Sequence, residues 1–224
     1  MPNLGRSRTL RSSSGHLAGA AVQLKIEGAS RRRCSNAQRT VTAQLDRLAL
    51  MLDDVDLDAD ALPAERAVVR ALANEWSSRS GGAFNPDSPA DMATLTRGWI
   101  LDQAIDRVMQ LRPGINSITV AAGPDAVHAG SVAATVTVGP EDTAPPSSRV
   151  RLAGAAAITA TSQAGSATVV SHDAASAAAL ACSLLRVGAQ DVASRIPDAS
   201  DPAWMTIGAD GQVETSAAWS ELAV

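Results

Sequence analysis

The 224-residue sequence has no tyrosine, a single phenylalanine and only two cysteines. Cys34 and Cys182 are too few for a disulfide framework, which favours a reducing, cytoplasmic compartment. The longest nearly apolar stretch, 174–185, is far shorter than the ~20 residues that a membrane-spanning helix needs. Gln23 and Lys25 also interrupt the stretch where a secretory signal would need an unbroken apolar centre. We therefore expect a cytoplasmic protein without a membrane span.

Charge is unevenly distributed along the chain. The net charge of −4 argues against a dedicated nucleic-acid-binding protein, whose binding domain is usually strongly basic. Residues 1–40 nevertheless carry eight basic and one acidic residue. Residues 1–14 are rich in Arg and Ser, and they are predicted to form a disordered basic arm. The 46% apolar content is enough for residues 15–224 to form one domain or two interlocked lobes.

Hydrophobic periodicity predicts an α+β fold with mixed or antiparallel sheets packed against helices. A helix starting near Pro63 is expected to bury Val68, Leu72 and Trp76 and to stop before Gly81-Gly82. Asp173 is a suitable N-cap for a small-residue helix. The other helices are expected at 37–53, 98–111, 174–187 and 189–195, and strands at 22–26, 118–120, 132–138, 150–161 and 167–171, with a hairpin around Asp210-Gly211.

An acidic run at 53–60 has the spacing of a calcium-binding loop. Carboxylates fall at positions one, three, five and seven counted from Asp54, with Glu65 at position twelve. Ala59 stands where the sharp turn of such a loop needs glycine, and Pro63 lies inside it. A solvated loop is therefore favoured over a cation site, although the sequence leaves both open.

Familiar catalytic signatures are absent from the sequence. It contains no phosphate-binding G-x-x-x-x-G-K-[ST], no G-x-G-x-x-G and no G-x-S-x-G motif. The three histidines do not fall at metal-binding spacings. Cys182, in an apolar helical stretch, is interpreted as a small buried residue rather than a nucleophile.

Five segments resemble, in the same order, those of the FAD:protein FMN transferases, once labelled thiamine-biosynthesis lipoproteins. Residues 80–86 (SGGAFNP) look like that family's S-G-G-A-F-D-P, and residues 91–102 (DMATLTRGWILD) are similar to D-L-G-G-I-A-K-G-Y-A-V-D. The remaining matches are weaker and lie at 118–130, 158–162 and 175–184. The resemblance covers nearly the whole chain after residue 15, and it implies a single domain of two interlocked lobes.

The resemblance implies an activity and a set of site residues. In the family a Mg²⁺ ion holds the FAD pyrophosphate while FMN is transferred to a Thr of a target flavoprotein, releasing AMP. By position, Asp91 would contact the flavin nucleotide, and Arg97 would replace a ligand-contacting Lys. The Thr94 backbone oxygen would face the metal. The flavin pocket would be lined by Ala83, Phe84 and Asn85.

The sequence departs from the family at the metal site. The family's Asp and Thr metal ligands, four residues apart on one helix, correspond here to Ala178 and Cys182. Magnesium prefers oxygen ligands, and neither side chain offers one. The family's H-x-x-D-P-x-T-G segment is also absent between Ser162 and Val169. We therefore expect a homologue with weakened or lost catalysis.

Two alternatives remain open from the sequence. One is a non-catalytic flavin- or protein-binding module on the same scaffold, and the other is an unrelated α+β interaction protein. FAD would be the ligand of a transferase homologue or of a flavin-binding module on its scaffold. Mg²⁺ is expected only because the family uses it. A target flavoprotein is implied only for an active enzyme, and the sequence does not set the oligomeric state.

Overall fold

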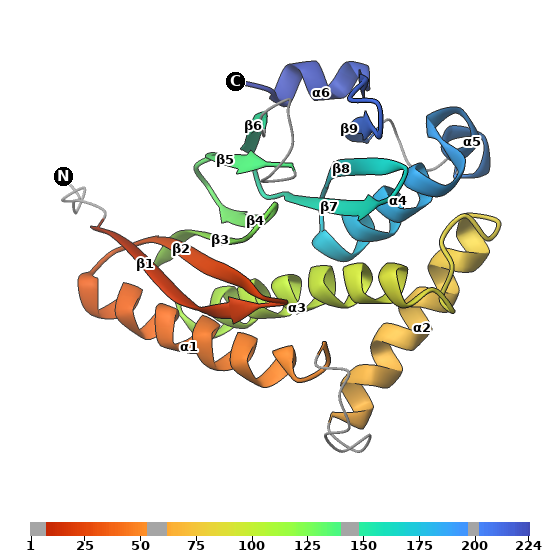
Figure 1. Cartoon of the computed structure of the whole chain (residues 1–224). Coiled ribbons are helices and arrows are strands. Elements are labelled where there is room, and N and C mark those ends of the chain that lie inside the picture. Colours follow the sequence, from red (N-terminus) through yellow and green to blue (C-terminus); the bar gives the residue numbers. More distant parts are fainter. Residues whose placement is uncertain (1–7, 53–61, 140–147, 197–201) are drawn as a thin grey trace.

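The computed structural model describes residues 8–52, 62–139, 148–196 and 202–224, which form an α+β fold around an eight-stranded sheet (Figure 1). The strand order is β1-β2-β3-β4-β7-β8-β9-β10, and the described pairs are antiparallel. Strands β5 and β6 form a separate antiparallel pair. The strands are β1 Arg8–Leu17, β2 Ala20–Gly28, β3 Ile115–Ala122, β4 Asp125–Gly130, β5 Ala134–Val138, β6 Ser148–Leu152, β7 Ala156–Ser162, β8 Gly165–Ser171, β9 Ala203–Gly208 and β10 Val213–Thr215; the helices are α1 Arg31–Ala49, α2 Pro63–Arg79, α3 Pro89–Leu111, α4 Ala174–Val187, α5 Ala189–Arg195 and α6 Ala217–Leu222.

Strand β1 corrects the expected disordered arm. Residues 8–14 lie in β1, which pairs with β2 in a register that sets Arg8 opposite Gly28. Residues 1–7 lie outside the described part of the chain. The prediction was wrong for 8–14 because backbone hydrogen bonds hold this edge strand, and these need no apolar side chains.

Helix α3 is the centre of the molecule (Figure 1). It packs against α1 on one side and α4 on the other. Helix α1 covers β1 and β2, whereas α4 covers β7 and β8. One continuous buried core runs through these elements, and a second cluster lies between the sheet, β5, β6 and α6.

The two helices α3 and α4 approach closely at Gly98. A Cβ atom at this position would lie 2.6 Å from the backbone oxygen of Ala174, at the start of α4. Asp173 caps α4 by accepting a hydrogen bond from the Ser176 amide at 2.6 Å. The Asp102 carboxylate of α3 accepts from the amides of Ala174 and Ala175 at 2.9–3.0 Å. These contacts fix α4 along α3.

Several expected elements differ in extent. Helix α1 begins at Arg31 rather than at 37 and ends at Ala49, because Ser30 caps its start by accepting from the Arg33 amide. Helix α3 begins at Pro89 rather than at 98, because Ser88 caps it by accepting from the Asp91 amide. The predicted extended stretch 150–161 is divided between β6 and β7, which belong to different sheets.

The buried face of α2 also differs from the prediction. Trp76 is buried as expected, but Val68 is 51% exposed and Leu72 is only partly buried. Val69 and Ala73 occupy the core positions instead. The helix ends at Gly81 and Gly82, where φ values of +56° and +82° suit glycine.

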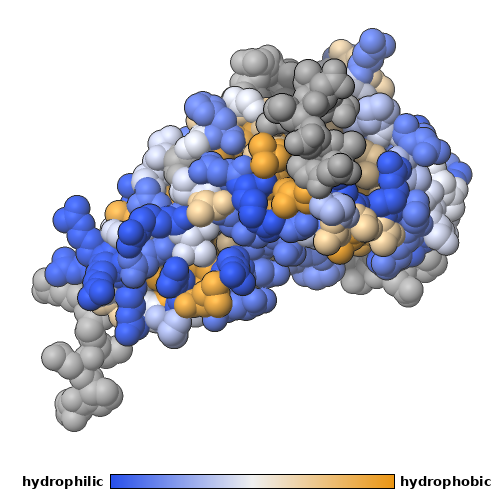
Figure 2. Space-filling view, turned by 90° about the horizontal axis from the view of Figure 1, so that it is seen from below, coloured by the Kyte–Doolittle hydropathy of each residue, from blue (hydrophilic) through white to orange (hydrophobic). Residues whose placement is uncertain are grey.

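The surface seen from below in Figure 1 is mostly hydrophilic, with hydrophobic residues in separate small groups (Figure 2). In the described part of the chain, no helix combines the length and apolarity that crossing a bilayer requires. The acidic run at 53–60 lies outside the described residues, so its prediction stays a prediction.

Candidate functional site

A cavity of about 270 Å³ lies between the start of α3, the end of β7 and the second half of α4. We call it the Asp91 pocket. Three residues singled out from the sequence, Asp91, Thr94 and Cys182, line it together. Arg186 and hydroxyl-bearing side chains complete the polar part of the wall. The fold thus brings together residues that are far apart in the sequence.

Asp91 is held by donors from three directions. Its carboxylate accepts from the backbone amide of Asn85 at 2.9 Å and from the Ser88 hydroxyl at 3.0 Å. The Arg186 guanidinium donates to the same carboxylate at 2.8 Å. The Asp91 side chain is only 10% exposed. Its negative charge is therefore paired within the protein.

The face of α4 that reaches the pocket carries no oxygen ligand at the two family positions. Ala178 is fully buried, and its side chain is a methyl group. Burial, together with the nearby Asp91 charge, raises the pKa of Cys182 to about 12, and Thr94, Arg97 and Arg186 offset only part of this rise. The thiol is therefore protonated at neutral pH and serves neither as a nucleophile nor as a hard-metal ligand.

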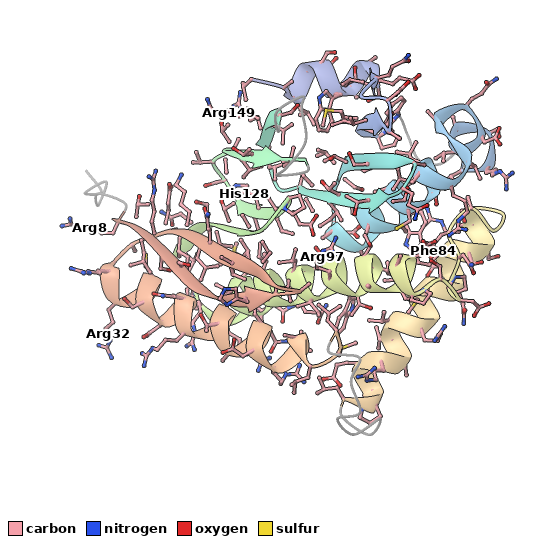
Figure 3. The ribbon with its side chains drawn as sticks, in the orientation of Figure 1. Arg8, Arg32, Phe84, Arg97, His128 and Arg149 are labelled. Carbon is pink, nitrogen blue, oxygen red and sulfur yellow. The ribbon has the colours of Figure 1, made fainter. Side chains whose placement is uncertain are left out.

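Arg97 of α3, labelled in Figure 3, forms an internal ion pair with Asp125. Its Nε donates to the Asp125 carboxylate, and its Nη2 donates to the Thr159 carbonyl at 3.1 Å. Asp125 is completely buried and also accepts from the Thr159 amide at 2.8 Å. Burial raises the pKa of Asp125, and the Arg97 charge and the Thr159 amide partly offset that rise. Arg97 joins α3 to β4 and β7, and it is not among the residues lining the Asp91 pocket.

The three residues expected to line a flavin pocket lie in the connection between α2 and α3. Ala83 and Phe84 are buried in the described structure, at 1% and 0% exposure. Phe84 is labelled beside the end of α2 in Figure 3. Its amide donates a hydrogen bond to the Ser80 hydroxyl at 2.9 Å. Asn85 is closer to the pocket, because its amide binds Asp91. None of the three lines the Asp91 pocket, so their assignment to a flavin site stays a prediction.

Larger hollows lie elsewhere in the described structure. One of about 980 Å³ is formed by β1–β3 and β5, and one of about 450 Å³ lies beside α2, α3 and the start of α4. His128 borders the latter, and its ring contacts the Thr119 hydroxyl at 3.0 Å and the Val132 carbonyl at 2.8 Å. This histidine is 3% exposed and fully engaged, as a core histidine would be.

Solved structures share this architecture over nearly its whole length. The ApbE protein of Thermotoga maritima superposes with a TM-score of 0.70 at 12% identity, covering 96% of this chain and 99% of that chain. The flavin transferase ApbE of Vibrio cholerae gives a TM-score of 0.67 at 12% identity and the same coverage. The flavinyl transferase ApbE of Pseudomonas stutzeri gives 0.66 at 14%, covering 99% and 100%. The chain has the ApbE fold.

Comparison of sequences finds no relative, in contrast to the comparison of structures. No protein-family model matches this chain, and no curated protein sequence does. The fold expected from the resemblance is confirmed, whereas 12–14% identity does not carry activity or ligands across. The ApbE fold places α3, α4 and β7 around the Asp91 pocket, and the chemistry must be argued from the residues in it.

The residues around the Asp91 pocket do not fit a magnesium ion. The family positions offer a methyl group and a protonated thiol, and the carboxylate nearby is bound by a guanidinium. Among the described residues, no group of three or more His, Cys, Asp and Glu side chains lies close enough to hold a metal. Magnesium needs near-octahedral oxygen ligands, and these side chains do not supply them.

Two residues that shape the site were not singled out from the sequence. Arg186 follows Cys182 by one helical turn, so its spacing could have placed it on the same face of α4. Asp125 had no such signal, because only the pairing of β4 with β7 brings it to Arg97. A carboxylate at the start of a strand does not by itself reveal a buried partner.

Proposed function

We propose that this chain is a divergent homologue of the FAD:protein FMN transferases that retains a flavin-nucleotide pocket but has weakened or lost transfer activity. The observation that supports it most strongly is the combination of an ApbE fold over 96% of the chain with a replaced donor set in the Asp91 pocket. The fold match argues for the scaffold, and the donor set argues against efficient catalysis.

Loss of the metal would remove the main source of charge neutralisation in the reaction. Transfer of FMN from FAD breaks the pyrophosphate bond, so negative charge must be stabilised on the leaving AMP. Among the described residues, the one guanidinium that lines the Asp91 pocket belongs to Arg186, and it is paired with Asp91. Arg97 is held by Asp125 instead. A pocket with this charge balance supports binding better than phosphoryl transfer.

The second candidate is a non-catalytic flavin- or protein-binding module on the same scaffold. It is favoured by the internal pairing of both Asp91 and Arg97, the two charged residues that the resemblance assigns to the ligand. The first candidate allows residual transfer activity, whereas the second has none.

A transfer assay distinguishes them. The purified chain would be incubated with FAD, Mg²⁺ and a target flavoprotein, with AMP release and covalent flavin on the target as readouts. The Vibrio cholerae flavin transferase serves as the positive control. We expect no more than a small fraction of its turnover. Efficient transfer that is abolished by Asp91→Ala would contradict weakened catalysis, and slow transfer abolished by the same variant would exclude the non-catalytic module.

A further inference from the structure

Three successive turns of α4 present Ala178, Cys182 and Arg186 toward the same side of the helix. The first two occupy the positions at which the resemblance places metal ligands, and the third ends in a guanidinium at the Asp91 pocket. We propose that Arg186 supplies the positive charge of the absent metal, so that the pocket binds a phosphate-bearing ligand without a divalent cation. This inference rests on the proposed function for the identity of the ligand as a flavin nucleotide.

The geometry of Arg186 leaves it able to bind a ligand. A guanidinium has five N–H donors, and the described contacts use Nη2 toward Asp91. The Arg186 side chain is 40% exposed, whereas Asp91 is 10% exposed. The carboxylate therefore holds the arginine from the protein side while further donors stay open to the cavity. A planar guanidinium also matches phosphate oxygens in a bidentate arrangement.

Hydroxyl groups on the opposite walls can complete the contacts to phosphate oxygens. Thr161 and Ser162 lie at the end of β7 and line the pocket, whereas the Ser88 hydroxyl is already used by Asp91. Thr161 and Ser162 are exposed, so their hydroxyls are accessible to a ligand. The cavity volume of about 270 Å³ lies just under the ~300–1,000 Å³ typical of whole-ligand sites. It therefore suits the phosphate part of a nucleotide, with the rest of the ligand outside.

The same arrangement disfavours a divalent cation. A metal ion beside the Arg186 guanidinium would be repelled, and this repulsion is stronger in a partly buried pocket than in water. Asp91, whose carboxylate lines the pocket, already accepts three hydrogen bonds. Nucleotide binding at this site should thus be insensitive to the removal of Mg²⁺.

Titration calorimetry with FAD, FMN and inorganic pyrophosphate, each in EDTA and in Mg²⁺, tests the inference. The variants are Arg186→Met, which removes the charge, and Arg186→Lys, which keeps the charge but not the planar fork. Arg107→Met is the matched control, because Arg107 is exposed on α3 ~24 Å along the helix from Asp91. Circular dichroism verifies that each variant is folded.

We expect all three ligands to bind equally well in EDTA and in Mg²⁺. Arg186→Met should weaken binding by about tenfold or more, Arg186→Lys by less, and Arg107→Met not at all. Flavin binding that needs Mg²⁺, or that is unchanged in Arg186→Met, would overturn the role of Arg186 while still supporting a flavin nucleotide as the ligand. Pyrophosphate binding through Arg186 without binding of FAD or FMN supports the inference and refutes the flavin ligand. No binding of any of the three overturns both.

Discussion

Replacing Arg97 with methionine tests whether this residue is a structural partner of Asp125 or a free ligand-binding cation. Asp125 has no exposed surface, and Arg97 and the Thr159 amide are its polar partners in the described structure. Breaking a buried ion pair by removing one partner usually costs ~3–5 kcal/mol, because the remaining charge is left uncompensated. We expect Arg97→Met to lose free energy of unfolding of that order.

Urea denaturation followed by circular dichroism measures this loss. With a denaturant slope of ~2–3 kcal/mol/M, the unfolding midpoint should fall by about 1–2 M. Adding Asp125→Asn to Arg97→Met removes the uncompensated charge and retains an acceptor for the Thr159 amide. The double variant should therefore recover much of the lost stability. Arg107→Met should change stability by less than about 0.5 kcal/mol.

The pH dependence provides an independent check of the same pair. Burial already raises the pKa of Asp125 in the native protein, and removing Arg97 raises this pKa further. Below that pKa the native variant binds a proton that the unfolded chain does not yet bind, so its stability rises as the pH falls toward ~4. The difference between variant and wild type should be smaller at pH 5 than at pH 8. A loss below about 1 kcal/mol that is independent of Asp125 and of pH would refute the structural role of Arg97.

Three other perturbations test the elements around the pocket. Gly98→Ala should destabilise the fold by ~1–3 kcal/mol in thermal unfolding, because its Cβ would meet the Ala174 oxygen at 2.6 Å; an unchanged melting temperature would contradict the close approach. Burial raises the pKa of Asp102 to about 6, so the native state holds a proton that the unfolded chain releases near pH 4. As the pH rises from 4 to 6, the free energy of unfolding should fall by on the order of 2–3 kcal/mol. Asp102→Asn should reduce this pH dependence, as measured by urea denaturation at each pH. Cys182 should resist alkylation at pH 8 in the native protein and react once the chain is unfolded; rapid native labelling would refute its raised pKa.

Local patterns in the sequence predicted the bounds of the C-terminal elements most closely. Helix α4 was expected at 174–187 and is observed there, because Asp173 caps its start and Gly188 follows its end. Helix α5 and the β9–β10 hairpin also lie where the sequence placed them. The short helix α6 was not predicted, since six residues are too few to show a helical period.

The site was predictable in outline but not in its charge pairing. The resemblance assigned Asp91, Thr94 and Cys182 to one site, and in the structure all three line the same pocket. The ion pairs that occupy Asp91 and Arg97 depend on residues distant in the sequence, which meet only in the folded chain. In these ion pairs, Asp91 and Arg97 bind protein groups, whereas the resemblance assigns both residues to the ligand.

The account depends most on the claim that the Asp91 pocket lacks a metal site. Electron paramagnetic resonance of Mn²⁺, titrated into the protein in the presence of FAD, measures this directly. We predict that the signal stays that of free Mn²⁺, because Ala178, Cys182 and the Arg186-bound Asp91 offer no suitable oxygen set. One tightly bound Mn²⁺ per chain, lost in Asp91→Asn, would contradict the account.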